Sequence, residues 1–313
     1  MDKNKKILAC ILTAMVMVSS YTKQAYTTNV VQGAKANVEH SSKNLEECSI
    51  DLVDVSKNIM NSSPNIVKYS TSLVNYNTSV NKKKQTNSQK NSIETKVIKW
   101  NSKWTYAKNS KIHSDSVVLY QVTGKKRKGK VITINAGHGT KGGSKVKTLC
   151  HPDGSPKVTG GSTAAGATKA TAVSSGTTLL NGMSEAKANL KFANILKDVL
   201  LENGYDVLMI RESDDVQLDN IARTVYANNN SDCHIALHYD STESNKGFYY
   251  ISVPNNKKYR KMEPVASNWK KHHALGNSLI EGVKNKKIKI FGSGSLAMDL
   301  TQTSYSTIPS VDL

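Results

Sequence analysis

The chain has 313 residues, of which 38% are hydrophobic, and it carries a formal net charge of +19. This length allows one or two domains with a sizeable core, but the low hydrophobic fraction indicates that part of the chain does not fold. Four cysteines without a CxxC motif argue against a disulfide framework and against a thiolate zinc site. The charge suits an anionic polymer, either bacterial cell wall or nucleic acid, and does not choose between them.

The first 25 residues have the three-part pattern of a secretory signal peptide. Lys3, Lys5 and Lys6 form a basic start, residues 7–20 are an apolar run, and small or polar residues follow. A helix that stays uncleaved as an anchor is the alternative interpretation. We expect a secreted, cell-wall-associated protein without a stable membrane span, because no later apolar stretch is long enough to cross a bilayer.

Residues 26–128 are rich in Asn, Ser, Thr and Lys, and their aliphatic residues occur only in short clusters. The stretch NKKKQTNSQKN, residues 81–91, cannot contribute to a core. This composition predicts a stalk or linker over 26–128 that is mostly disordered. The composition changes near Lys130, so a folded domain is expected over 129–313.

From residue 129 onward, short β-branched runs alternate with helical periodicity. The run 131–134 predicts a buried strand that leads into a Gly-rich loop, and residues 140–182 predict a long functional loop. A helix is expected from its N-cap at Ser184 to the Asn203-Gly204 stop. The later elements are strands over 205–210, 235–237, 247–253 and 308–313, with helices around 218–225 and 275–283.

This alternation predicts an α/β fold with a mostly parallel sheet flanked by helices, preceded by a low-complexity N-terminal region. Ligands in such sheets bind at the carboxyl ends of the strands. His138 follows the first of these strands and His238 follows the third. Both imidazoles are therefore expected at the same rim of the sheet.

Glu185 is a third candidate ligand, because it opens the long helix and falls near its core-facing side. Two imidazoles and one carboxylate form a known catalytic zinc set, with water in the fourth position. Each residue also has an ordinary interpretation: a polar loop residue for His138, a helix cap for Glu185, and a partner of the backbone for His238. The spacing of the three residues does not decide between these interpretations.

Three ordered motifs resemble those of the zinc-dependent N-acetylmuramoyl-L-alanine amidases, the type 3 amidase family. They are VITINAGHG (131–139), SEAKANLKFANILKDVLLENGYDVLMIRESD (184–214) and SDCHIALHYDS (231–241). The resemblance covers residues 130–313 and implies that a zinc ion (Zn2+) is held by His138, Glu185 and His238. It also implies hydrolysis of the amide bond between N-acetylmuramic acid and L-alanine in peptidoglycan, with a zinc-bound water as the nucleophile.

The last strand departs from the family's pattern. The resemblance implies a catalytic glutamate shortly after a proline, and the matching segment here is 307–313, with Pro309. The glutamate is expected to follow Leu313, so the catalytic domain is interpreted as truncated before its last motif and the catalytic residue as unknown. Asp312 stands where the family has an apolar residue, and a slip along the strand would turn its side chain to the other face. The alternative function is therefore a zinc-retaining but inactive peptidoglycan-binding protein.

The partners expected from this resemblance are peptidoglycan and, through lysines between 270 and 289, anionic wall polymers; a solvated basic face is the simpler interpretation of these lysines. Nucleic acid is not expected, because the chain lacks a basic motif with interleaved aromatic residues. We expect a monomer.

The sequence also predicts the environment of six further residues. Arg211 and Arg223 match recurrent arginines of the family and are expected to form structural ion pairs. A packed interior position is expected for His234. A loop or surface position is expected for His151, His272 and His273.

Overall fold

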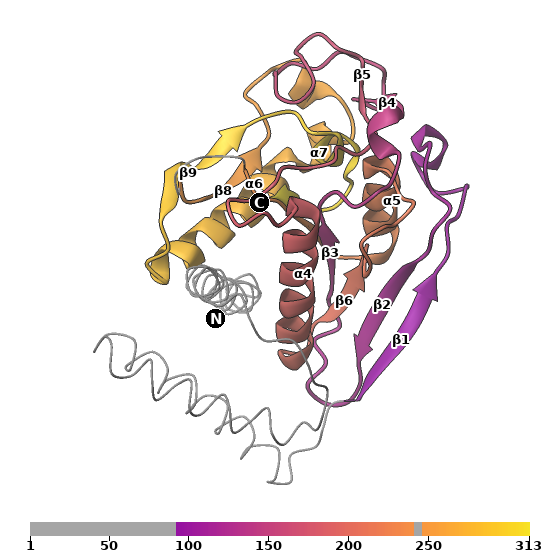
Figure 1. Cartoon of the computed structure of the whole chain (residues 1–313), viewed down its shortest axis with the longest axis vertical. Helices are drawn as coiled ribbons and strands as arrows, with labels where there is room; N and C mark the ends of the chain where they lie inside the picture. The colour runs from indigo at the N-terminus through magenta and orange to yellow at the C-terminus, as the bar shows by residue number, and fades with distance from the viewer. Residues whose placement is uncertain (1–91, 241–245) are drawn as a thin grey trace, which may run out of the picture. The chain divides into compact units, whose positions relative to one another are not determined.

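The computed structural model describes residues 92–240 and 246–313 of the chain (Figure 1). The expected signal peptide, residues 1–25, and the expected stalk up to residue 91 lie outside the described residues. Within the described part, no helix has the length and apolar character needed to cross a membrane.

Six strands form one mixed sheet at the centre of the fold. They are β1 (Ile93–Ile98), β2 (Val117–Val122), β3 (Val131–Ala136), β6 (Asp206–Met209), β7 (Cys233–Leu237) and β10 (Ser310–Asp312). Their order in the sheet is β1-β2-β6-β3-β7-β10. The β6–β3, β3–β7 and β7–β10 pairs are parallel, whereas β1–β2 and β2–β6 are antiparallel. The expected α/β class is confirmed.

Four α-helices accompany the sheet in the described part of the chain. They are α4 (Glu185–Glu202), α5 (Asn220–Asn230), α6 (Val265–Asn285) and α7 (Thr301–Tyr305). The expected start of α4 is confirmed, since the Ser184 side chain accepts a hydrogen bond from the Lys187 amide. Asp219 caps α5 in the same way through the Ala222 amide. Gly204, which follows the end of α4, has a φ of 83°, a left-handed conformation that favours glycine.

The remaining elements are short or stand apart from the main sheet. They are β4 (Lys147–Leu149), β5 (Lys169–Thr171), β8 (Phe248–Ser252), β9 (Ile290–Ala297) and the 3-10 turns η1 (Ala107–Asn109), η2 (Gly143–Lys145) and η3 (Tyr259–Lys261). The expected strand at 247–253 exists as β8, but it pairs with β9 in a separate two-stranded sheet.

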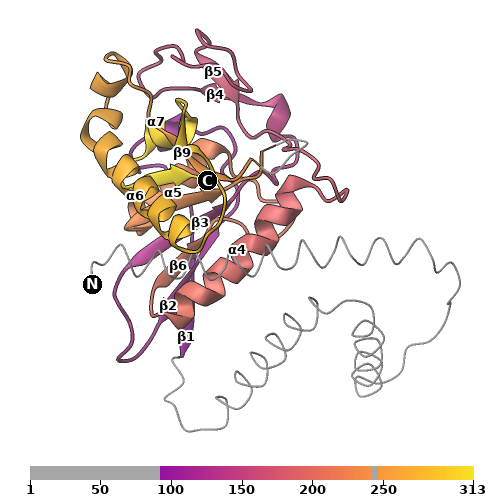
Figure 2. The same cartoon turned by 90° about the vertical axis from the view of Figure 1, so that its left-hand side faces the viewer.

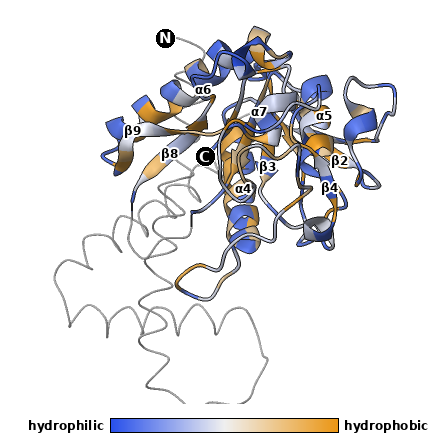
Figure 3. Ribbon diagram, turned by 90° about the horizontal axis from the view of Figure 1, so that it is seen from above, coloured by the Kyte–Doolittle hydropathy of each residue, from blue (hydrophilic) through white to orange (hydrophobic). Residues whose placement is uncertain are grey.

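Successive residues of β6 and Ile210, which follows it, face two different apolar cores, one on each side of the sheet. Val207 and Met209 pack in the core that includes residues of α4 and α6, whereas Leu208 and Ile210 pack in the core that includes residues of α5. Figure 2 shows the helices around the sheet from the side, and Figure 3 shows hydrophobic residues gathered around β3 with hydrophilic residues over much of α6. Burial on both faces explains why these strands read as continuous apolar runs.

The domain boundary expected at residue 129 is wrong, because β1 and β2 belong to the main sheet. Val117 and Val122 of β2 are buried, and β2 pairs with β6 over Val118–Tyr120. Trp100 and Trp104 pack against Tyr226 of α5 with ring centroids 5.4 Å apart. The described part of the domain therefore begins at Ser92, well before the expected boundary, because β1 and β2 extend the sheet beside β6.

His234 of β7 is fully buried, as expected, and neither ring nitrogen has a hydrogen-bond partner among the described residues. Burial, with a contribution from Arg223, lowers the pKa of His234 to about 3. In the unfolded chain the ring takes up a proton below its ordinary pKa of about 6.5. Folding stability is therefore lost as pH falls below that value, because only the unfolded state binds this proton.

We expect His234→Leu to weaken the dependence of the unfolding free energy on pH. Between pH 6.5 and 5 the wild-type protein should lose about 1.5 kcal/mol of unfolding free energy through His234 alone, and the leucine variant should lose that much less. Urea unfolding at the two pH values measures the difference. Identical pH dependence in the two proteins would show that the ring is charged or hydrated in the folded state.

Candidate functional site

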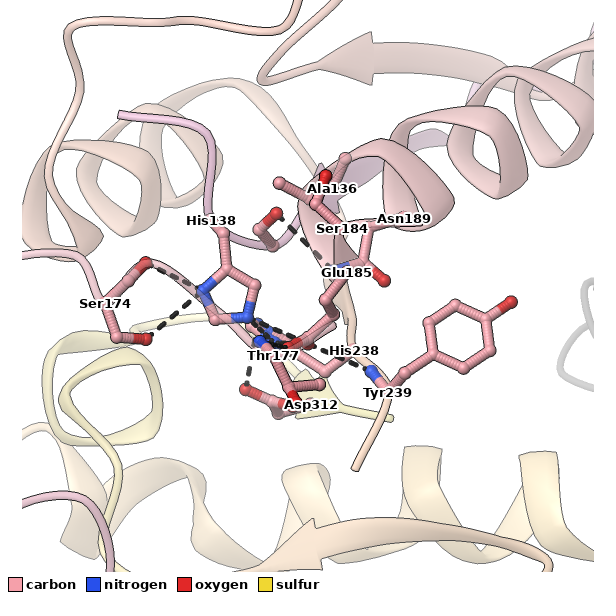
Figure 4. Close-up of polar contacts among 12 residues, drawn as sticks. Ala136, His138, Ser174, Thr177, Ser184, Glu185, Asn189, His238, Tyr239 and Asp312 are labelled. Carbon is pink, nitrogen blue, oxygen red and sulfur yellow. Dashed lines mark hydrogen bonds and ion pairs between the residues drawn. The ribbon is translucent and has the colours of Figure 1, made fainter. Parts of the chain in front are cut away.

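Two parallel strands bring His138 and His238 to one rim of the sheet. In the β3–β7 pair, Ala136 lies opposite Leu237. His138 follows β3 by two residues and His238 follows β7 directly, so the expected meeting at the carboxyl ends occurs (Figure 4). Glu185, the first residue of α4, projects between the two rings.

The donor atoms of the three residues converge closely. Glu185 Oε1 lies 2.8 Å from His138 Nε2 and 2.9 Å from His238 Nδ1, and the two ring nitrogens are 3.0 Å apart. The imidazoles meet nearly edge to face, with an interplanar angle of 86°. His138 and Glu185 are buried, whereas the His238 side chain is 31% exposed. One side of the cluster is therefore open to a ligand.

Charge and hydrogen bonding favour the ionised form of Glu185. Burial by itself raises the pKa of this carboxyl, but hydrogen bonds from His138 and His238 outweigh it and hold the pKa well below its usual range. Burial lowers the pKa of His238, yet Asp312 and Glu185 together bring it above the ordinary value. A proton on His238 must leave before its Nδ1 can bind a metal.

The donor set fits a divalent metal of the zinc type. Within residues 92–240 and 246–313, these three residues form the group of potential ligands whose donor atoms all lie within 4.8 Å of one another. Ligands at about 2.0–2.1 Å from a tetrahedral zinc ion are about 3.3 Å apart, so the three atoms need to separate by only a few tenths of an ångström. Two nitrogen donors and one carboxylate leave a fourth position for water.

The glycines of the loop that follows β3, residues 137–139, allow this close approach. A Cβ at Gly137 would lie 2.3 Å from Cε1 of His238, and one at Gly139 would lie 2.8 Å from the Arg211 guanidinium carbon. His138 itself has a φ of 63°, an uncommon conformation for a residue with a side chain. Gly137 and Gly139 of the NAGHG motif are therefore required for backbone packing at the site, while His138 between them supplies the candidate ligand.

Arg211 and Arg223 donate hydrogen bonds to backbone carbonyl oxygens at the end of β3 and in the loop that follows it. The ion pairs expected for the two arginines are not found within the described residues. Arg211 donates to the carbonyl oxygens of Ala136 and Gly137 at 3.2 and 3.0 Å. Arg223 donates to the His138 carbonyl oxygen at 2.7 Å. Both guanidiniums are buried, and burial lowers the pKa of Arg223 to about 9, so it stays charged at neutral pH. The two arginines bind carbonyl oxygens instead of carboxylates, because the backbone at this point offers several carbonyl oxygens that need a donor.

Asp312 also faces the cluster, which the sequence interpretation did not expect. Its Oδ2 lies 3.8 Å from His238 Nε2, on the side of the ring opposite Glu185 (Figure 4). Burial raises the pKa of Asp312, although His238 and His138 oppose this. The strand register accounts for the placement, because Asp312 pairs with Ala236 next to the rim. In the sequence, the only indication of this placement is a carboxylate at a position of the strand where an apolar residue is expected.

A cavity of ≈ 250 Å³ adjoins the cluster. Its wall includes His138, His238 and Asp312, with two basic residues, Lys157 and Arg223, and both apolar and neutral polar side chains around them. The neutral polar residues include Ser162, Thr163, Thr171, Ser174, Asn220, Thr301 and Gln302. The long loop expected at 140–182 thus supplies one wall of the cavity.

The loop is attached to the rest of the domain by Asp299. Its carboxylate accepts hydrogen bonds from His151 Nε2 at 3.1 Å and from the Val158 amide at 2.7 Å, and Lys157 Nζ lies 2.9 Å from it. His151 is therefore buried, and so is His272, whose Nδ1 accepts from the Ser310 amide. His273 is partly buried, with Nε2 accepting from Val253. His151 lies in a loop as expected, although its side chain is buried there. The loop or surface position expected for His272 and His273 is wrong, because both belong to α6 and their rings contact other segments.

A family model described as N-acetylmuramoyl-L-alanine amidase matches residues 132–310, more than half of the chain. No curated protein matches the chain. Several solved structures match the chain. The apo form of the N-acetylmuramyl-L-alanine amidase Ami1 from Mycobacterium abscessus is 18% identical, with a TM-score of 0.43, over 59% of this chain and 82% of that one. The amidase AmiC2 of Nostoc punctiforme is 15% identical, with a TM-score of 0.35, over 61% and 79%. The family match includes the strands and the helix that carry the cluster, and the chain belongs to the N-acetylmuramoyl-L-alanine amidase family, a family of hydrolases.

Proposed function

We propose that this protein is a secreted, zinc-dependent hydrolase that cleaves the amide bond between N-acetylmuramic acid and L-alanine in bacterial peptidoglycan. The convergence of His138 Nε2, Glu185 Oε1 and His238 Nδ1 to within 3.0 Å supports it most directly. A bound zinc ion would acidify a water molecule and polarise the scissile carbonyl.

The chain's own residues bind and orient the substrate. The hydroxyl and amide side chains of the cavity match the hydroxyl and amide groups of a glycopeptide, since neutral polar partners can donate and accept hydrogen bonds without a charge to desolvate. His238, the most exposed ligand candidate, marks the side from which the amide carbonyl approaches.

The general base is proposed on the strand that ends beside His238. The His238 amide donates to the Leu313 carbonyl oxygen at 3.0 Å, which places the end of β10 at the rim of the cluster. Within the described residues, Asp312 is the carboxylate on this strand that could take the proton from the attacking water. Asp312→Asn should therefore lower the rate of stem-peptide release without removing the metal.

The proposed activity predicts a metal-dependent release of stem peptides. Purified peptidoglycan incubated with the protein should yield new free amino groups on L-alanine, and a chelator should abolish them. Zinc should restore the reaction after the chelator is removed, and magnesium should not, because nitrogen donors favour zinc. Amino-group labelling and mass spectrometry of the soluble products measure the release.

Two results contradict the proposal in different ways. Release that survives the chelator would remove the metal from the mechanism. One bound zinc per chain without any release would favour the alternative, a zinc-retaining peptidoglycan-binding protein.

A further inference from the structure

The last turn of the long loop lies directly against two of the three candidate ligands (Figure 4). The Ser174 carbonyl oxygen is 2.8 Å from His138 Nδ1, and the Thr177 amide donates to Glu185 Oε2 at 2.9 Å. Between them, Gly176 passes the ring and the carboxylate at close range. Residues 174–177 are called the ligand-facing turn below.

Each contact of the ligand-facing turn leaves the correct atom for the metal. The Ser174 carbonyl oxygen can only accept, and the Ser174 hydroxyl, 3.2 Å from the same nitrogen, can accept as well, so a hydrogen on His138 Nδ1 satisfies both contacts and leaves Nε2 as the nitrogen that faces the metal. The Thr177 amide occupies Oε2 of Glu185, which leaves Oε1 as the oxygen nearest to both imidazoles. Partners of this kind fix the tautomer and the orientation of a metal ligand.

Gly176 makes the close contact sterically feasible. Its φ is 79°, and a Cβ at this position would lie 2.7 Å from His138 Cδ2 and 3.0 Å from Glu185 Oε2. No side chain fits there unless the ring or the carboxylate moves. At Gly176 the backbone of the turn therefore lies directly against both ligands.

The ligand-facing turn is itself fixed at both ends. Before it, the Ala172 amide donates to the Val146 carbonyl oxygen at 2.9 Å. After it, the Thr177 carbonyl oxygen accepts from the Glu185 amide at 2.8 Å, which ties the turn to the first residue of α4. A turn anchored in this way can hold a ligand geometry rather than follow it.

We propose that residues 174–177 are positioning residues that set the His138 ring and the Glu185 carboxylate in their metal-binding geometry before the ion arrives. This inference rests on the proposed zinc function. It gives the long loop a second role besides lining the cavity: the loop determines how tightly the metal is held.

Gly176→Ala tests the proposal, with Gly182→Ala as its matched control. Gly182 lies in the same loop with a φ of 78°, but a Cβ there meets nothing within 4 Å, so both variants carry the same backbone strain and only one displaces the ligands. Competition with a chromophoric chelator should show zinc affinity about 10–100-fold weaker in Gly176→Ala. Gly182→Ala should match the wild type. Equal affinity in all three proteins overturns the proposal.

Two spectroscopic readouts keep the test independent of turnover and of the variant's folding. The visible spectrum of the cobalt-loaded protein should change in Gly176→Ala and not in Gly182→Ala, because it reports ligand geometry. In wild-type protein with 15N-labelled histidine, NMR should show a hydrogen on His138 Nδ1 both with and without zinc. An Nδ1 without a hydrogen in the metal-free protein would overturn the proposal. A wild-type protein that binds no zinc would instead remove the proposed function itself.

Discussion

Glu185→Gln is expected to abolish hydrolysis and to weaken zinc binding by more than the roughly 10–100-fold typical of residues that only support a ligand. Glu185 Oε1 is the atom on which both imidazoles converge, and it also accepts the Tyr239 amide at 3.0 Å. The substitution keeps the size of the side chain but removes its charge. A neutral amide oxygen is a far poorer zinc ligand than a carboxylate.

The effect should extend to the metal-free protein. Oε2 of Glu185 accepts from the Thr177 amide, and a glutamine can offer only one acceptor oxygen to the donors around it. Its NH2 group would face either a backbone N–H or an imidazole N–H, leaving a buried donor unpaired at about 1–3 kcal/mol. Urea unfolding of chelator-treated protein measures this loss.

Glu202→Gln is the matched control, because Glu202 is the exposed last residue of the same helix. It should leave zinc affinity, measured by chelator competition, and peptidoglycan hydrolysis unchanged. Retention of tight zinc binding in Glu185→Gln would mean that the metal is held by other atoms, and the assignment of the cluster would have to be abandoned.

The parts of the fold that the sequence predicts are those whose signal is local. The β-branched run of β3 is recognisable because burial on both faces favours an unbroken apolar and β-branched run. The start of α4 is recognisable from Ser184 and its end from Gly204, since caps are properties of a few adjacent residues. His138 and His238 can be paired from the sequence alone because parallel strands end at the same rim.

The parts that the sequence does not predict depend on contacts between distant segments. The strand β2 has only a short apolar pattern, and its place beside β6 follows from tertiary pairing. Asp299 has the sequence context of an ordinary loop residue, yet it is bonded to the 151–159 segment. The shortest contacts of the ligand-facing turn are made by backbone atoms of Ser174 and Thr177, and backbone contacts leave no signature in the residue types. The orientation of Asp312 depends on the register of β10.

Arg223→Met is expected to cost about 3–5 kcal/mol of unfolding free energy, the range for removing one member of a buried charged network. The guanidinium is fully buried and donates to three carbonyl oxygens and two side chains. These are the carbonyl oxygens of Leu218, Ala136 and His138, with Asn135 Oδ1 and Thr140 Oγ1. Methionine fills a similar length without any donor, so the His138 carbonyl oxygen and Asn135 Oδ1 would stay desolvated and lose their donor. The carbonyl oxygens of Ala136 and Leu218 would keep a second donor, Arg211 and Thr140 respectively.

Two opposing effects decide the size of this loss. Burial of the charge is costly, as the lowered pKa of Arg223 shows, and methionine removes that cost. Each acceptor left without a donor, however, forfeits about 1–3 kcal/mol, and the losses at the His138 carbonyl oxygen, Asn135 Oδ1 and Thr140 Oγ1 together outweigh one desolvated guanidinium that is already fully hydrogen-bonded. Arg260→Met is the control, because Arg260 also donates to two carbonyl oxygens, those of Pro254 and Val253, but is only partly buried, so water can replace its donors.

Urea unfolding of Arg223→Met, Arg260→Met and wild-type protein in excess chelator measures the stability terms, and chelator competition measures zinc affinity. Arg223→Met should lose both, since its bond to the His138 carbonyl oxygen supports a residue with a φ of 63° next to the metal-binding ring. Arg260→Met should lose about 1 kcal/mol or less and keep its zinc affinity. If Arg223→Met were as stable as wild type, the buried hydrogen bonds would only balance the desolvation of the charge, and the strained loop at His138 would have to be held by the packing of its glycines against His238 and Arg211.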